Sequence, residues 1–304
     1  MQMQNYHYAS LLAASQQVNW KIEDIIGGDK RLDFSRRFMP ESLARVNELD
    51  FLSDDEQRVL NQIRGHAYLA IFGLVEEFIL PFVMDHTRGS LQPDDFKTRA
   101  MLAFAAEEAK HIQLFKRFRE EFVAGFGTDC AMIGPPEAVA QHILSHSALG
   151  VALVTLHIEW MTQRHFLDSI DRDQDLDPQF KSLLRNHWLE EAQHAKLDTL
   201  MVFNIARELD PAGIQAGLED YLKIGGFLDE GLKQQTEFDL QALQTATGRT
   251  LTPQQREQFM RVQHQSNRWT YLGSGMSHPK FLEAVGALDP AWRAKLEQVY
   301  PLFS

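Results

Sequence analysis

The side chains best suited to carry out chemistry lie in two segments that nearly repeat each other. Glu107–His111 reads Glu-Glu-Ala-Lys-His, and Glu190–His194 reads Glu-Glu-Ala-Gln-His, 83 residues further along the chain. A further glutamate, Glu76 or Glu159, precedes the second glutamate of each segment by 32 residues. Four carboxylates and two imidazoles in this order are a ligand set for two metal ions inside a four-helix bundle. Such ligands suit Fe²⁺ or Mn²⁺, so the pattern predicts a redox metal centre.

Helical spacing explains how these residues can share a site. Residues three apart lie on one face of a helix, so Glu108 and His111 can ligate together, as can Glu191 and His194. The upstream and motif glutamates lie at similar distances from the intervening hairpin turns, which places all four carboxylates at similar depth in the bundle. Their helix faces are apolar, and a buried carboxylate is costly unless it is paired or bound to a cation. The alternative is that these glutamates form salt bridges with Lys or Arg at helix ends.

Two positions leave the ligand set open. Glu77 competes with Glu76 because both have an apolar stripe, although the 83-residue offset of the repeat favours Glu76. His187 lies four residues before Glu191 and seven before His194, so it shares their helix face. We predict that His187 is a third imidazole ligand; the alternative is a core histidine that hydrogen-bonds a carboxylate.

Other polar residues near these motifs are expected to orient the ligands. Asp198, four residues beyond His194, is expected to accept a hydrogen bond from the ring N–H of a ligating histidine and so fix its tautomer. Glu107 and Glu190 could act in the same way across the bundle, and a solvated surface position is their alternative. Packing or surface roles are expected for His66, His142, His146, His157 and His165.

The elements that must position these residues are four long helices. Ser53–Glu56 is typical of a helix cap with acidic first-turn residues. The polar run Asp171–Pro178 marks a turn whose proline suits the first turn of the next helix. A longer connection over 123–136 joins two helical hairpins, as in bundles with one crossover. The predicted helices cover about residues 54–86, 96–122, 136–170 and 178–209.

The flanking segments predict additional helices around this core. Residues 1–50 are expected to form an irregular, partly helical lead-in. Residues 212–304 predict several helices that pack on the bundle, with breaks near Gly225–Gly226, Gly248–Pro253 and Gly273–Pro279. The fold class predicted is therefore all-α, a single domain over 1–304 with its metal-binding core at about 54–209.

Composition narrows the possible partners and the compartment. The net charge of −12 argues against nucleic acid, whose phosphates would be repelled. The single cysteine, Cys130, excludes an intrachain disulfide and a thiolate-rich metal site, and it is compatible with a reducing cytoplasm. The first residues lack a basic region followed by an apolar run, and no uncharged apolar stretch is long enough to span a bilayer. We therefore expect a cytoplasmic protein without a signal peptide, a nucleic-acid partner or a membrane partner.

The order Glu, Glu-x-x-His, Glu, Glu-x-x-His over residues 55–209 resembles the ferritin-like diiron carboxylate superfamily. Within it, His187-x-x-x-Glu191-x-x-His194 is similar to the p-aminobenzoate N-oxygenase (AurF-like) family, whose members carry a third metal-binding histidine on the last core helix. The resemblance implies a centre of two iron ions that reduces O₂ and transfers oxygen, typically to an aryl amine nitrogen. One departure is that the common Asp-Glu-x-x-His form is Glu-Glu-x-x-His in both repeats here.

We therefore predict a diiron oxygenase, with Mn as an alternative at one or both sites, that uses O₂ to oxidise a small organic substrate such as an amine nitrogen. Such an enzyme needs an electron-donor reductase, and a homodimer is the default oligomer. The alternatives are a metal-binding oxidase or ferroxidase without an organic substrate, and a non-catalytic bundle or one-metal hydrolase. All predicted ligands except His187 are also predicted to be catalytic; the ligands are Glu76, Glu108, His111, Glu159, His187, Glu191 and His194.

Overall fold

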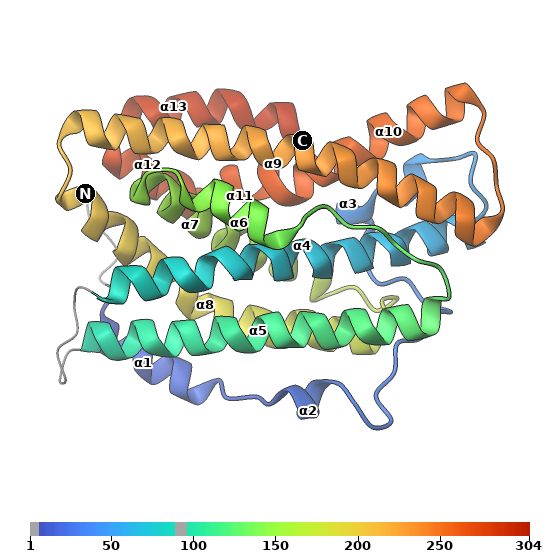
Figure 1. Cartoon of the computed structure of the whole chain (residues 1–304), viewed down its shortest axis with the longest axis horizontal. Coiled ribbons are helices and arrows are strands. Elements are labelled where there is room, and N and C mark those ends of the chain that lie inside the picture. The colour runs from blue at the N-terminus through green and yellow to red at the C-terminus, as the bar shows by residue number, and fades with distance from the viewer. Residues whose placement is uncertain (1–5, 89–95) are drawn as a thin grey trace.

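The computed structural model describes residues 6–88 and 96–304, and the elements in these ranges are helices with no β-strand (Figure 1). The all-α prediction is therefore confirmed. Two pairs of helices form the core: α4 packs along α5, and α7 packs along α8, while α5 and α8 also contact each other. The bounds of these core helices are α4 (Asp54–Arg88), α5 (Phe96–Phe126), α7 (Ala148–Arg164) and α8 (Pro178–Arg207).

Local hydrogen bonds at the helix starts explain why the core helices begin where they do. The Ser53 hydroxyl accepts from the Glu56 backbone N–H, and the Glu56 carboxylate accepts from the Ser53 N–H, which is a reciprocal capping box. The Asp177 carboxylate accepts from the backbone N–H of Phe180 at the start of α8. Asp210 caps α9 (Pro211–Thr247) in the same way. These polar residues therefore set the register of the helices that carry the site.

The predicted single helix over 136–170 is wrong, because the structure divides it. Ser147 has an extended backbone, with ψ 145°, and its hydroxyl accepts from the Gly150 N–H, so a new helix starts there. The resulting elements are α6 (Pro136–Leu144), α7 and the π-helical turn η2 (His165–Ile170). α6 packs against α4 and α7, and so forms part of the crossover between the two hairpins.

The predicted break near Gly225–Gly226 is wrong, because helix α9 is continuous there. It continues through Gly225 and Gly226, because glycine in a helix interior costs about 1 kcal/mol relative to alanine without ending the helix. The helix ends instead at Gly248, whose φ of +69° is the left-handed conformation that favours glycine. The break near Gly248–Pro253 is thus confirmed. The elements that follow are α10 (Pro253–Arg268), η3 (Trp269–Gly273), α11 (Ser274–Met276), α12 (Pro279–Leu288), α13 (Pro290–Val299) and η4 (Tyr300–Phe303).

Both flanking segments pack on the four-helix core. α9 lies along α7 and α4, with α10 against α9, and these helices cover one side of the bundle (Figure 1). The described part of the N-terminal segment is partly helical, as the sequence predicts, and its helices are α1 (Tyr8–Gln17), α2 (Ile22–Ile25), α3 (Glu41–Ala44) and η1 (Val46–Glu48). On the other side of the bundle, helices α1 and α2 contact α5 and α8, whereas α3 contacts α10 and η2, and η1 contacts α4.

Among the described helices, α4 is long and apolar enough to span a membrane by length and composition. It contains an 18-residue window with a mean hydropathy of 1.8. However, 67% of that window is buried inside the protein, where α4 contacts α5, α6 and α9. Its position in the core accounts for its apolar composition.

Candidate metal centre

The four core helices bring the predicted ligands to one level of the bundle interior. α4 and α7 each contribute one glutamate, α5 contributes the Glu-x-x-His pair, and α8 contributes three side chains. Each of these side chains belongs to a residue that is at most 2% exposed. The residues are Glu76, Glu108, His111, Glu159, His187, Glu191 and His194.

A first group of donors combines two carboxylates and two imidazoles. The ligand atoms of Glu76, His111, His187 and Glu191 all lie within 4.8 Å of one another. His187 Nε2 is 3.3 Å from Glu76 Oε1 and 2.5 Å from Glu191 Oε1. His111 Nδ1 is 4.0 Å from Glu76 Oε2 and 3.0 Å from Glu191 Oε1. The third imidazole predicted from the sequence therefore lies inside the cluster.

A second group lies beside the first and shares two of its members. It consists of Glu108, His111, Glu191 and His194, again with ligand atoms within 4.8 Å of one another. His194 Nδ1 is 2.9 Å from Glu108 Oε1 and 2.8 Å from Glu191 Oε2. Glu191 thus directs Oε1 to the first group and Oε2 to the second, which is the arrangement of a bridging carboxylate. His111 has one ring nitrogen facing both groups, so it can bind only one ion.

Glu159 completes the ring of carboxylates from α7. It is 2% exposed, its Oε2 has no hydrogen bond, and its carboxyl group interacts with that of Glu191. Burial, followed by the charge of Glu191, raises the pKa of Glu159 well above its usual value. This carboxyl group therefore lies near Glu191, His194 and Glu108 of the second group, although it belongs to neither set of ligand atoms that lie within 4.8 Å of one another.

The donor set fits metal ions better than it fits the salt-bridge alternative. Within residues 6–88 and 96–304, the ion pairs of the four cluster glutamates are all with histidines and none is with Lys or Arg. Buried acceptor oxygens without a hydrogen bond are expensive, and several of them converge here. Those oxygens are Glu76 Oε2, Glu108 Oε2 and Glu159 Oε2. Cations between these carboxylates would satisfy them.

Protons on the imidazoles balance the carboxylates when no cation is bound. Burial lowers the pKa of His111, but the carboxylates of Glu191, Glu190 and Glu108 outweigh burial and raise it to about 9. The pKa of His194 is raised well above its usual value because the same kind of carboxylate contact outweighs burial. A ligating imidazole must be neutral, so metal binding must displace these protons.

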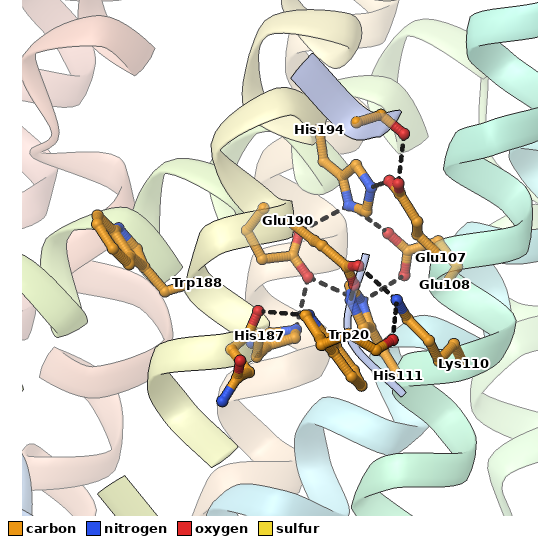
Figure 2. A network of polar contacts seen from close by, with 12 residues as sticks. Trp20, Glu107, Glu108, Lys110, His111, His187, Trp188, Glu190 and His194 are labelled. Carbon is orange, nitrogen blue, oxygen red and sulfur yellow. Dashed lines mark hydrogen bonds and ion pairs between the residues drawn. The ribbon is translucent and has the colours of Figure 1, made fainter. Parts of the chain in front are cut away.

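Two glutamates hold the ligand histidines from the opposite helix (Figure 2). His111 of α5 places Nε2 2.8 Å from Glu190 Oε2 of α8, and His194 of α8 places Nε2 2.7 Å from Glu107 Oε2 of α5. When Nε2 donates to the glutamate, the lone pair of Nδ1 points into the cluster. Glu190 is 0% and Glu107 is 9% exposed, which excludes the solvated surface alternative.

A further layer of side chains, not predicted from the sequence, surrounds these glutamates. Ser15 Oγ donates to Glu107 Oε1 at 2.5 Å, and Lys110 forms an ion pair with Glu190. The Lys110 ammonium also lies 3.8 Å from the ring centroid of Trp20 (Figure 2). Lys110 is inside a motif and could have been found. Ser15 and Trp20 lie in the irregular N-terminal segment, where no spacing signal marks them.

Two sequence alternatives are resolved by burial and contacts. Glu77 is exposed, whereas Glu76 is buried and belongs to the first group of donors. The predicted hydrogen bond from a histidine ring N–H to Asp198 is wrong. Both Asp198 oxygens lack a hydrogen bond, because Glu107 takes Nε2 of His194. Burial raises the pKa of Asp198 well above its usual value, which favours its neutral form.

A cavity of about 190 Å³ lies on the far side of α7 from the cluster. Its α7 wall includes Val154 and Ile158, whereas Glu159 points into the bundle. Tyr221, Gly225 and Gly226 of α9 form another wall, together with residues of η3 and η4. None of the seven predicted ligands lines this cavity. It is therefore separated from the donor groups by the α7 backbone.

Comparison with known proteins identifies the fold. No protein-family model matches the chain, and no curated protein sequence matches it. A variant of the R2-like ligand-binding oxidase with an anaerobically reconstituted Mn/Fe cofactor aligns with a TM-score of 0.51 and 14% identity, covering 91% of this chain and 93% of that chain. Another variant, with an Fe/Fe cofactor, gives a TM-score of 0.47 and 15% identity over 87% and 93% of the two chains. The protein thus has the ferritin-like all-α fold of the first structure.

Proposed function

We propose that this protein is a dimetal oxidase that uses O₂ to oxidise a small organic substrate. The observation that carries the proposal is the pair of buried donor groups that share Glu191. The R2-like ligand-binding oxidase with the same fold is described with a Mn/Fe cofactor, which supports iron, or iron with manganese, as the metals to test here. An electron-donor reductase is part of the proposal, because O₂ reduction consumes electrons.

Each side chain of the cluster has a defined task in this proposal. Glu76 and His187 would hold one ion, Glu108 and His194 the other, and Glu191 would bridge them. His111 faces both positions and Glu159 adds a further carboxylate, as described above. Two bound metal ions would supply the redox equivalents for O₂ reduction and stabilise the developing negative charge.

Aromatic rings exclude water from these donors. Phe104 stacks on His194 with ring centroids 4.1 Å apart, and Phe115 contacts His187 at 4.9 Å. Phe104 and Phe115 are at most 1% exposed. A water-free site strengthens the electrostatic interactions inside it and protects reactive species from side reactions. The rings also fix both imidazoles, so that the ligands are held before metal binds.

Within this function, we propose an amine nitrogen as the first substrate class to test. The support is His187, which brings a third imidazole to the first donor group and matches the spacing of the AurF-like pattern. The third histidine, His187, is what distinguishes this chain from the diiron carboxylate pattern, which has only the two histidines of its Glu-x-x-His motifs.

The test is O₂ consumption by protein loaded anaerobically with Fe²⁺, alone or with Mn²⁺, in the presence of a chemical reductant and a panel of aryl and alkyl amines. We expect substrate-dependent O₂ uptake beyond the amount needed to oxidise the bound iron. Glu191→Ala should abolish it, while Glu77→Gln, a change at an exposed neighbour of the site, should leave it intact. Failure of the wild-type protein to bind iron would overturn the proposal.

A ferroxidase without an organic substrate is the second candidate. The observation in its favour is that the 190 Å³ cavity is separated from the donor groups by α7. The same assay separates the candidates: a ferroxidase would consume O₂ in proportion to added Fe²⁺, and no amine would change the stoichiometry.

A further inference from the structure

A buried phenol–imidazole pair lies in the core near the proposed metal centre. The Tyr68 hydroxyl is 2.9 Å from Nδ1 of His165, and Nε2 of the same ring is 2.9 Å from Oγ of Ser274. The Ser274 hydroxyl in turn donates to the Thr270 carbonyl at 2.9 Å. All four residues are at most 2% exposed. The three contacts form one continuous hydrogen-bonded chain without solvent.

The Thr270 carbonyl at the end of this series of hydrogen bonds determines which atom carries each proton. Ser274 has one hydroxyl proton, and it is used on the Thr270 carbonyl, so the Ser274 oxygen accepts from Nε2–H of His165. Nδ1 of His165 is then unprotonated and accepts from the Tyr68 hydroxyl. Burial lowers the pKa of His165 to about 3 and raises that of Tyr68 well above its usual value. The pair is therefore a neutral phenol facing a neutral base.

Aromatic contacts connect Tyr68 to the predicted metal ligands. Its ring centroid is 4.5 Å from that of Phe72, and Phe72 lies 5.6 Å from the His187 ring in an edge-on contact. His187 in turn contacts Glu76 and Glu191. Tyr68 precedes Glu76 by eight residues on α4, which corresponds to about 12 Å along the helix axis. One phenyl ring thus separates the phenol from a ligand imidazole.

We propose that Tyr68 is a redox-active residue whose hydroxyl proton moves to Nδ1 of His165 when the phenol loses one electron. The Tyr68 O–H bond would break and an N–H bond would form on His165, and a bound pair of metal ions, oxidised by O₂, would accept the electron. The resulting phenoxyl radical on Tyr68, beside a protonated His165, would store one oxidising equivalent away from the predicted metal ligands. An electron from the substrate or the reductant, with return of the proton from His165, restores the phenol. This inference rests on the proposed oxidase function.

The local backbone supports a special role for His165. It is the first residue of the π-helical turn η2, and π-helical turns are frequent at functional sites. Burying a neutral imidazole against a phenol has no packing advantage over a phenylalanine pair. A positioned base explains the pair, because loss of an electron from a buried phenol needs a nearby proton acceptor.

A second phenol–imidazole pair provides a matched control. The Tyr221 hydroxyl is 2.8 Å from Nδ1 of His157, whose Nε2 is 3.1 Å from the Tyr271 carbonyl oxygen. Tyr221 and His157 are buried as well. In the described part of the chain, the ring contacts of Tyr221 are with His157 and Phe281, not with a predicted metal ligand. One difference between the two pairs is therefore the path of ring contacts through Phe72 to His187, which, within the described residues, Tyr68 has and Tyr221 lacks.

The experiment is rapid-freeze electron paramagnetic resonance of the full chain after anaerobic loading with Fe²⁺ and exposure to O₂. We expect an organic radical whose signal narrows in protein grown with ring-deuterated tyrosine. Tyr68→Phe should lose this signal, and Tyr221→Phe should keep it. His165→Gln should slow radical formation by about 100-fold or more, the usual contribution of a positioned base. Thermal melts of each variant confirm folding.

The outcomes separate this inference from the oxidase function. Iron oxidation is followed in the same samples with a colorimetric Fe²⁺ chelator. If two irons bind and are oxidised by O₂ but no tyrosine-derived radical forms, or if Tyr68→Phe retains the radical, the role of Tyr68 is overturned and the oxidase function stands. If the wild-type protein binds no iron, both proposals fail.

Discussion

Raising the pH is predicted to destabilise the metal-free protein through two of the predicted metal ligands, His111 and His194. The pKa of His111 is about 9 in the folded protein, compared with about 6.5 in an unfolded chain. A pKa that is raised by folding means that the protonated imidazole stabilises the fold, and this contribution is fully present below about pH 6.5. It is lost as the pH rises through about 9. The window of the effect is therefore between these two values.

The magnitude follows from the gap between the folded and unfolded pKa of His111. The gap corresponds to about 3 kcal/mol of unfolding free energy. His194 shifts in the same direction and adds to the loss. For a chain of this size, about 3 kcal/mol corresponds to a fall in melting temperature of roughly 6 °C. Metal ions require neutral imidazoles, so their stabilising effect should grow over the same window.

The assay is thermal unfolding followed by circular dichroism from about pH 6 to about pH 9.5, with and without Mn²⁺. Mn²⁺ is chosen because it binds the same ligand types without reacting rapidly with O₂. The curves with and without metal should diverge as the pH rises, and His111→Gln should flatten the metal-free curve. Parallel curves, or an unchanged metal-free slope in His111→Gln, would show that protonation of His111 does not stabilise the metal-free fold.

Further predictions concern orientation of the ligands and packing of the core. Glu190→Gln should weaken metal affinity by about 10- to 100-fold, measured by competition with a fluorescent chelator, because it loosens a ligand imidazole. Asp239→Ala leaves the buried guanidinium of Arg64 without its carboxylate partner and should lower the free energy of unfolding, measured with urea, by about 3 kcal/mol. Gly65→Ala places a Cβ 2.8 Å from Phe38 Cβ and should destabilise by roughly 1–3 kcal/mol. In contrast, Gly225→Ala meets no atom within 4 Å and should stabilise by about 1 kcal/mol.

The part of the site that lies on long helices could be predicted from the sequence. The Glu-x-x-His spacing identifies one face of each helix, and the 83-residue offset selects Glu76 over Glu77. Burial and contacts in the structure place Glu76 and His187 in the cluster. These predictions succeed because the spacing of residues along a regular helix determines which side chains share one face, whatever the rest of the fold. Their role as metal ligands stays a prediction.

The sequence failed where tertiary contacts decide the outcome. Ser147 begins a new helix inside a segment whose apolar spacing is helical on both sides, and Gly225 fails to end α9 because the helix is supported along its length by α7 and α4. Asp198 lies on the ligand face, but Glu107 reaches the same ring nitrogen first from the opposite helix. Trp20 comes from an irregular segment, where spacing carries no directional information.

Metal content per chain shows whether the buried carboxylates and imidazoles hold two metal ions. Protein loaded anaerobically with Fe²⁺, desalted and measured by plasma mass spectrometry should contain two ions per chain in the wild type. Glu191 belongs to both donor groups, so Glu191→Ala should retain fewer than one. A wild-type chain with no ion or one ion, or a folded Glu191→Ala chain that still holds two, would contradict the account.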